Sequence, residues 1–164
     1  MRFILASASP RRKELLEQIG MKFQITVSEV EEKTTETAPD RYVMELSALK
    51  AEDVAGKIPV MYDARGIDQD FVVIGSDTVV AIGNDILGKP VDEQDAIRML
   101  RMLSGTTHQV YTGVTLIVFR NERIEKKTFY EKTDVTFYDM TEEEIEAYVS
   151  TSEPMDKAGA YGIQ

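Results

Sequence analysis

Two hydroxyls, Ser7 and Ser9, and three consecutive cations at residues 11–13 lie close together near the start of the chain. Ser9 followed by Pro10 is typical of the N-cap and first residue of a helix. A helix N-terminus has unpaired N–H groups and partial positive charge, which favour a bound anion. Three cations in the first turn oppose that dipole, so we predict a bound polyanion here. The plainer alternative is that the cations only keep the helix soluble.

A polar triplet interrupts the most hydrophobic run of the sequence. Residues 71–75 are rich in β-branched side chains and predict a central strand, which ends in Ser76, Asp77 and Thr78. Polar side chains in a buried strand are costly unless they are paired or functional. A carboxylate at a strand end can bind a divalent cation or act as a general base toward water. We favour these roles over the structural alternative, in which Asp77 caps neighbouring backbone N–H groups.

Other charged residues could complete such a site. Lys89 lies in a constrained glycine–proline loop and could neutralise phosphate charge, although a plain surface lysine is the alternative. Lys50 falls near the inner face of a predicted helix. Glu31 and Glu32 lie in an acidic loop, residues 28–38, and could add a metal ligand or could simply be solvated.

Two further residues have weaker signals. Gln164 lies in the terminal loop, and a side-chain amide can contact a nucleobase edge through its paired donor and acceptor. His108 is the sole histidine, and a lone histidine is more often structural than catalytic. We therefore leave His108 out of the predicted site.

The elements predicted around these residues alternate between strands and helices. Strands are expected at residues 3–6, 23–27, 71–75, 110–119 and 124–138. Helices are expected at residues 10–20, 39–55, 92–105 and 141–149. Alternating strands and helices with one long hairpin predict an α/β domain with a mixed sheet.

Composition and absent motifs exclude several classes of protein. The 164 residues, 43% of them hydrophobic, suit one domain with a substantial core. A net charge of −10 argues against nucleic acid or a membrane surface as a partner. The absence of cysteine excludes disulfides and thiol nucleophiles and fits a cytoplasmic protein, and neither a membrane span nor a signal peptide is recognisable. Motifs of P-loop NTPases, Rossmann dehydrogenases, zinc proteases and α/β-hydrolases are also missing.

Four stretches together resemble the Maf family of nucleotide pyrophosphatases. They are LASASPRR at residues 5–12, GSDTVV at 75–80, LGKP with SGTTH between 87 and 108, and DKAGAYGIQ at 156–164. Their order and spacing follow the family and span nearly the whole chain. One such match would be weak, whereas four together are highly specific.

The resemblance implies a Maf/inosine triphosphatase-like α/β fold, with an elongated mixed sheet, flanking helices and a central cleft between two lobes. It implies hydrolysis of a nucleoside triphosphate to the monophosphate and pyrophosphate with a divalent metal, Mg²⁺ or Mn²⁺. Family members often form homodimers. They also continue past Gln164 with a glycine-containing loop, a further strand and a closing helix. We therefore expect residues 1–164 to be a single Maf-like domain that lacks those last elements.

The resemblance also implies roles for individual residues. The matched cleft positions are Ser7, Arg12, Glu32, Lys50, Asp77 and Lys89. Asp77 is implied as the proton acceptor and, with Glu32, as the metal ligand. Arg12, Lys50 and Lys89 are implied to stabilise charge on the phosphoryl oxygens and the departing pyrophosphate, while the Ser7 hydroxyl holds phosphate oxygens.

Substrate choice is implied by a separate set of positions. Arg11, Thr78 and Gln164 match the combination that accompanies dTTP and UTP as substrates. The branch that acts on 7-methyl-GTP typically has tryptophan in place of the first arginine and lacks the terminal Ala-Tyr-Gly-Ile-Gln. The chain therefore resembles the dTTP/UTP branch. A role in clearing non-standard nucleotides is a further expectation for such an enzyme.

Other functions stay open at this point. One is a non-catalytic nucleotide-binding regulator, since the family is also linked with inhibition of septum formation in bacteria. The presence of both the acidic and the basic cleft residues argues against it, because a pure binder needs no general base. The others are a 7-methyl-GTP pyrophosphatase and a phosphatase or pyrophosphatase for another anionic metabolite.

Overall fold

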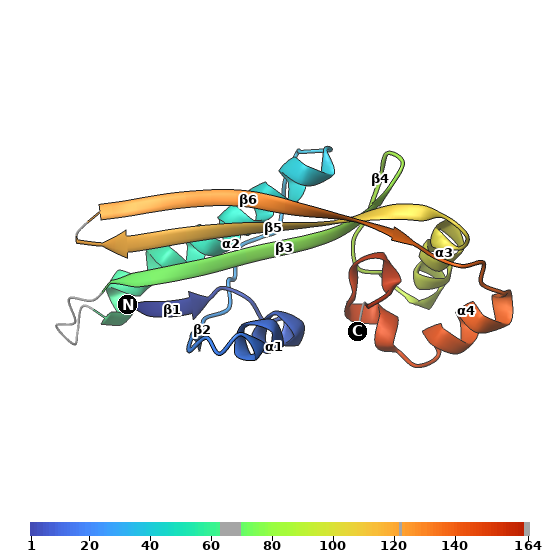
Figure 1. Ribbon diagram of the computed structural model, residues 1–164, viewed down its shortest axis with the longest axis horizontal. Coiled ribbons are helices and arrows are strands. Elements are labelled where there is room, and N and C mark those ends of the chain that lie inside the picture. The colour runs from blue at the N-terminus through green and yellow to red at the C-terminus, as the bar shows by residue number, and fades with distance from the viewer. Residues whose placement is uncertain (63–69, 122, 163–164) are drawn as a thin grey trace. The chain divides into compact units, whose positions relative to one another are not determined.

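The computed structural model describes residues 1–62, 70–121 and 123–162. Its strands are β1 (Arg2–Leu5), β2 (Gln24–Ile25), β3 (Phe71–Ile82), β4 (Asp85–Leu87), β5 (Thr107–Arg120) and β6 (Arg123–Thr136). Its helices are α1 (Pro10–Gln18), α2 (Pro39–Tyr62), α3 (Glu93–Leu103) and α4 (Glu142–Val149), with short 3₁₀ helices η2 (Glu153–Asp156) and η3 (Ala158–Ala160). The described strands form one sheet in the order β2-β1-β3-β5-β6, with β4 paired to β3 (Figure 1). Because β1 is parallel to both neighbours whereas β4 is antiparallel to β3, the predicted α/β class with a mixed sheet is confirmed.

The chain forms two compact units. The first comprises residues 1–77 and 113–130, and the second comprises residues 78–112 and 131–164. The long strands β3, β5 and β6 each contribute residues to both units.

The first unit is built on two parallel connections around β1. The chain leaves β1 through α1 to β2 on one side, and it returns through α2 to β3 on the other. Leu5 at the end of β1 pairs with Ile74 of β3, and the Ala6 N–H donates to the Ile74 carbonyl at 2.8 Å. Ligands of open α/β sheets bind beyond the carboxyl ends of strands at such a change of direction. Ser7 lies two residues after Leu5, just beyond β1, and Asp77 lies three residues after Ile74, within β3.

Helix α2 lies in direct backbone contact with the sheet. A Cβ on Gly75 of β3 would meet the Ser47 carbonyl oxygen at 2.3 Å, and one on Gly113 of β5 would meet the Val43 carbonyl oxygen at 2.2 Å. Val43 and Ser47 are one turn apart on α2. Two strands thus need glycine so that one helix face can approach them closely.

The same helix is longer than the sequence predicts. We expected it to end near Ala55, but it continues to Tyr62. Ile58, which is 4% exposed, extends the buried stripe of Ala51 and Val54 and packs in the same core cluster. Burial of that stripe favours further helical turns in spite of the proline at position 59. Residues 63–69 of the predicted connection lie outside the described part of the chain.

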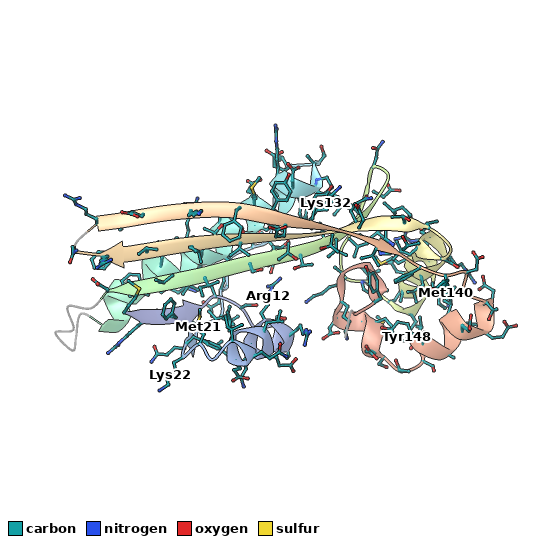
Figure 2. The ribbon with its side chains drawn as sticks, viewed as in Figure 1. Arg12, Met21, Lys22, Lys132, Met140 and Tyr148 are labelled. Carbon is teal, nitrogen blue, oxygen red and sulfur yellow. The ribbon has the colours of Figure 1, made fainter. Side chains whose placement is uncertain are left out.

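The second unit has its own core and well-capped helices. Asp92 caps α3 by accepting from the Asp95 N–H, and Thr141 and Glu144 form the predicted capping box of α4. Residues of α3, α4, β3 and η3 bury Leu100, Leu103, Ile145, Val80 and Ala160 together, and Met140 and Tyr148 (Figure 2) pack against this core. The predicted C-terminal loop contains η2 and η3 rather than irregular chain alone.

The apolar residues of α1 are more exposed than those of α2. Leu15 and Ile19 are 46% and 70% exposed, and α1 has no buried residue. No helix in the described part of the chain is both long and apolar enough to cross a membrane.

Candidate functional site

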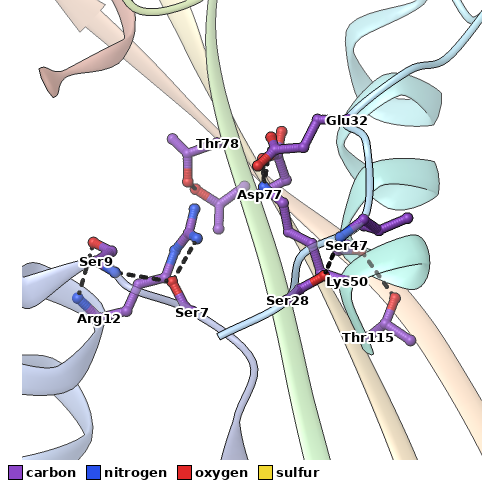
Figure 3. A network of polar contacts seen from close by, with 12 residues as sticks. Ser7, Ser9, Arg12, Ser28, Glu32, Ser47, Lys50, Asp77, Thr78 and Thr115 are labelled. Carbon is purple, nitrogen blue, oxygen red and sulfur yellow. Dashed lines mark hydrogen bonds and ion pairs between the residues drawn. The ribbon is translucent and has the colours of Figure 1, made fainter. Parts of the chain in front are cut away.

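The turn between β1 and α1 places an arginine against a serine. Ser9 is the N-cap of α1, as predicted, and its Oγ accepts from the Arg12 N–H at 3.5 Å. The Arg12 guanidinium in turn donates to Ser7 Oγ at 3.1 Å, and the Ser9 N–H donates to the same oxygen at 3.2 Å (Figure 3). Ser7 is only 7% exposed. This short turn therefore presents a hydroxyl, a guanidinium and helix N–H groups together.

The three cations of that turn do not point the same way. Arg11 lies 3.4 Å from Glu14, and Lys13 lies 3.8 Å from Glu17, with all four side chains about half exposed. Arg12 is the cation that bonds to Ser7 (Figures 2 and 3). The predicted cationic triplet is thus divided between two surface ion pairs and one inward-facing guanidinium.

A buried lysine joins two carboxylates from different parts of the chain. Lys50 Nζ, on α2, lies 2.6 Å from Asp77 Oδ1 on β3 and 2.8 Å from Glu32 Oε2 in the acidic loop (Figure 3). The side chains of Lys50 and Asp77 are 11% and 10% exposed, whereas that of Glu32 is 55% exposed. One ammonium therefore holds an interior and a solvent-facing carboxylate close together.

Burial and neighbouring charges shift the pKa values of Asp77 and Arg12 in opposite directions. Desolvation raises the pKa of Asp77, while the charges of Lys50 and Arg12 lower it in part. Desolvation also lowers the pKa of the Arg12 guanidinium, against the stabilising charges of Asp77 and Glu32. A carboxylate whose proton affinity is increased by burial is a better proton acceptor than an exposed one.

Tyr42 near the start of α2 is a member of this environment that sequence reasoning missed. Burial raises the pKa of its hydroxyl, and the nearby charges of Asp77 and Glu32 raise it further. The hydroxyl therefore stays protonated and able to donate at neutral pH. No local motif marks a tyrosine in a helix as such, so only its tertiary neighbours identify it.

A chain of hydrogen-bonded hydroxyls joins α2, near Lys50, to strands β5 and β6. Ser47 Oγ lies 2.9 Å from Thr115 Oγ1 on β5 (Figure 3). Thr115 Oγ1 in turn lies 3.0 Å from Thr128 Oγ1 on β6. Ser47 and Thr115 are fully buried. These bonds fix the turn of α2 that also carries Lys50.

The remaining predicted site residues belong elsewhere in the chain. Thr78 begins the second unit, and its Oγ1 lies 3.1 Å from Thr112 Oγ1. Lys89 is an exposed side chain of the second unit. The carbonyl of its neighbour Gly88 accepts from the Gly159 N–H at 2.9 Å. Gln164 lies outside the described residues. The structure thus brings together Ser7, Arg12, Glu32, Lys50 and Asp77, all in the first unit.

His108 lies in the core of the second unit. It is fully buried, and its Nε2 lies 2.7 Å from the Tyr161 hydroxyl. Burial lowers the pKa of His108 and raises that of Tyr161 to about 12. Both groups are therefore neutral at physiological pH.

A divalent cation would find two carboxylates in the first unit. No group of three or more histidine, cysteine or acidic residues within the described ranges could hold a metal ion by itself. Asp77 and Glu32, however, both lie within 2.8 Å of one cationic atom, Lys50 Nζ. Magnesium is commonly bound by one or two carboxylates together with substrate phosphates, and this pair fits that arrangement.

The parallel pair β1 and β3, with polar side chains beyond the carboxyl end of β1, defines an α/β protein with a candidate anion site. The chain belongs to the Maf family, because the family described as Maf-like protein matches residues 2–164. The family predicted from the four sequence stretches is therefore confirmed.

Three relatives share a common description. A dTTP/UTP pyrophosphatase of Agathobacter rectalis is 57% identical over 98% of this chain and 80% of that protein. A dTTP/UTP pyrophosphatase of Lachnoclostridium phytofermentans is 51% identical over 98% of this chain and 78% of its own length. A third, from Bacillus thuringiensis subsp. konkukian, is 50% identical over 99% of this chain and 78% of its own length.

Proposed function

We propose that this protein hydrolyses nucleoside triphosphates, with dTTP and UTP as substrates, to the monophosphate and pyrophosphate. The names of the relatives support the reaction and the substrate class. The observation that carries the proposal is the contact of Lys50 Nζ with both Asp77 and Glu32. This cluster combines a buried base with cations, as hydrolysis of a polyanion requires.

The proposed reaction is attack of water on the α-phosphorus. A new bond forms between the water oxygen and the α-phosphorus, and the bond to the bridging oxygen breaks as pyrophosphate leaves. Asp77 takes the proton from the attacking water. A carboxylate has two oxygens, so Asp77 can contact Lys50 through Oδ1 and accept the proton on the other. The raised pKa of Asp77 favours this transfer.

The remaining cluster residues bind and orient phosphate. Arg12 and the N-terminal N–H groups of α1 offer donors and positive charge to phosphate oxygens. Ser7 fixes the guanidinium of Arg12 and can share its hydroxyl with the substrate. Lys50 keeps the base oriented and offsets its charge. Preorganised charges of this kind commonly provide the largest part of the rate enhancement.

Asp77 and Glu32 would also hold a divalent cation, Mg²⁺ or Mn²⁺, together with the triphosphate. When bound, the ion would neutralise phosphate charge and make water more acidic. The roles of Lys89 toward pyrophosphate, and of Arg11, Thr78 and Gln164 toward the pyrimidine, are part of the same proposal and rest on the family stretches.

The decisive experiment is a pyrophosphate-release assay with dTTP, UTP, CTP, dATP, GTP and 7-methyl-GTP in Mg²⁺ or Mn²⁺. Asp77→Asn is measured beside the parent, with Asp134→Asn on exposed β6 as a matched control. We expect activity on dTTP and UTP that Asp77→Asn loses and Asp134→Asn keeps. Activity on 7-methyl-GTP alone would overturn the substrate assignment, and binding of dTTP without any pyrophosphate release would favour the regulator.

A further inference from the structure

On one side of Glu32, the acidic loop is attached to α2 through the Asp53 carboxylate and the Lys57 ammonium. The Ser28 hydroxyl and the Glu29 N–H both donate to Asp53 Oδ2, each at 2.9 Å. Lys57 Nζ, one turn along α2, lies 3.0 Å from the same oxygen and 3.0 Å from Glu29 Oε2. Asp53 therefore fixes both the backbone and a side chain at the start of the loop.

A second carboxylate of α2 holds the loop on the other side of Glu32. The Thr34 hydroxyl donates to Glu45, and the Glu36 N–H donates to Thr34 Oγ1 at 3.0 Å. Glu32 itself contacts Lys50 at 2.8 Å, between the two attachments. Glu45, Lys50 and Asp53 thus hold three successive points of the loop along about 12 Å of helix.

The acceptor in the attachment at Asp53 is an ionised carboxylate. Burial alone would raise the pKa of the Asp53 carboxyl, but donation from Glu29, Lys57 and Ser28 outweighs it, and the pKa lies below its usual value. Asp53 is therefore an anion at neutral pH, and bonds to ionised acceptors are stronger than neutral ones. The attachment at Glu45 lies on an exposed part of the helix.

The loop has no helix or strand that would otherwise fix its path. Residues 28–38 are irregular, and Glu32 is more than half exposed. An exposed carboxylate on an irregular segment samples many positions unless its neighbours are held. The contacts at Asp53 and Glu45 restrict both flanks, which leaves Glu32 close to Lys50 and Asp77.

We propose that Asp53 is a positioning residue for hydrolysis, which holds the acidic loop on α2 so that Glu32 is presented beside Asp77. The inference rests on the proposed function, in which these two carboxylates hold the divalent cation. Asp53 touches neither substrate nor reacting atoms. Its effect should therefore appear in the metal dependence of the reaction and in the order of the loop.

The first test compares the Mg²⁺ dependence of pyrophosphate release in the parent, Asp53→Ala and Asp53→Asn. Loss of residues that orient metal ligands commonly weakens metal binding by about 10–100-fold. We expect the Mg²⁺ concentration at half-maximal rate to rise by about tenfold in Asp53→Ala and by less in Asp53→Asn, which keeps an acceptor oxygen. At saturating Mg²⁺ the rate should return to near that of the parent.

The matched control is Glu52→Ala, because Glu52 is the adjacent residue of α2 and pairs instead with Lys126 on β6 at 2.6 Å. It should leave the Mg²⁺ dependence unchanged. A double-mutant cycle with Glu32→Gln separates positioning from general destabilisation. If Asp53 acts through Glu32, Asp53→Ala should add little to the Mg²⁺ midpoint of the Glu32→Gln variant.

Two measurements do not depend on turnover. Hydrogen exchange over residues 28–36 should accelerate in Asp53→Ala and not in Glu52→Ala. Binding of Mn²⁺, followed by electron paramagnetic resonance with a non-hydrolysable α,β-imido analogue of dTTP, should weaken in the same variant. An active parent with an unchanged Mg²⁺ midpoint and unchanged loop exchange in Asp53→Ala would overturn the inference. An inactive parent would instead overturn the proposed function, and the exchange measurement would still decide whether Asp53 holds the loop.

Discussion

Lys50 Nζ lies 2.6 Å from Asp77 Oδ1, and the two side chains are 11% and 10% exposed. The two residues are 27 positions apart, on α2 and β3. Desolvation raises the pKa of Asp77, and the lysine counteracts that rise. The pair therefore sets both the position and the proton affinity of the proposed base.

Replacing Lys50 by methionine should reduce turnover and shift its pH dependence. We expect a loss of about 10²–10³-fold at neutral pH, typical for one preorganised charge. Without the lysine the pKa of Asp77 rises further, so the acidic limb of the kcat/KM profile should move to higher pH. A profile that keeps its midpoint would show that Lys50 does not tune the base. Lys126→Met, which removes a lysine from a surface pair with Glu52, is the control.

Replacing Arg12 by alanine should weaken catalysis far more than the same change at Lys13. Arg12 points toward Ser7, whereas Lys13 lies in a surface pair with Glu17. We expect kcat/KM for dTTP to fall by about 10²–10³-fold in Arg12→Ala, because a positive charge that would contact the phosphates is removed. Lys13→Ala should stay near the parent value. Equal losses in the two variants would contradict the inward role of Arg12.

Gly75→Ala should destabilise the fold. The added Cβ would meet the Ser47 carbonyl oxygen at 2.3 Å and the Ala51 Cβ at 2.8 Å, so α2 must move. Overpacking of this kind typically costs about 1–3 kcal/mol in the free energy of unfolding, measured here by urea denaturation. Displacement of α2 should also reduce activity, since that helix carries Lys50.

Gly56→Ala on the same helix provides the opposite case. A Cβ at Gly56 meets nothing within 4 Å, and alanine favours a helix over glycine by up to about 1 kcal/mol. We therefore expect a small gain in stability and unchanged turnover. A loss of stability would contradict the open space around Gly56.

The stability of the protein should depend on pH through His108. Burial lowers the pKa of His108 in the folded state, so the unfolded state binds a proton first as the pH falls below about 6.5. The free energy of unfolding should decrease over that range and be independent of this group above it. His108→Gln should remove this part of the slope in urea denaturation at a series of pH values. An unaltered slope would show that another group is responsible.

Tyr161→Phe should show how much the 2.7 Å hydrogen bond between Tyr161 and His108 contributes to the free energy of unfolding. Its removal leaves a buried ring nitrogen without that partner, so a loss of about 1–3 kcal/mol in unfolding free energy is expected. His108→Gln in the Tyr161→Phe background should then cost less than in the parent. Additive losses would mean that the two residues stabilise the core independently.

Local chemistry made much of the fold predictable from sequence. Ser9, Asp92 and Thr141 each cap a helix through an N–H three residues further along, so the cap can be recognised within one turn. The hydrophobic pattern predicted a buried strand before Asp77 and placed Lys50 near the inner face of its helix, and both Lys50 and Asp77 are buried. The expected strand end at Asp77 is wrong, because β3 continues through the polar triplet to Ile82. The Maf family itself follows from four short stretches in order, and the family match over residues 2–164 agrees.

Other features depend on partners far away in the chain. The family resemblance gave Arg12 and Arg11 different roles, but residue types and spacing alone could not show that Arg12 contacts Ser7 while Arg11 pairs with Glu14. It could not predict that Asp53 would hold the acidic loop 24 residues away. The length of α2 was also underestimated, because the proline at position 59 suggested an earlier end, whereas burial of Ile58 in the core favours further turns.

The sequence by itself thus determined the family, the helix starts and the chemical groups available for catalysis, since these depend on residue type and short spacing. The tertiary structure decided which of those groups meet. It placed Lys50 between Asp77 and Glu32 because α2 packs against glycines of β3 and β5, and a close backbone approach needs both partners in place. Contacts between distant segments arise only when the chain is folded, so no window of the sequence contains them.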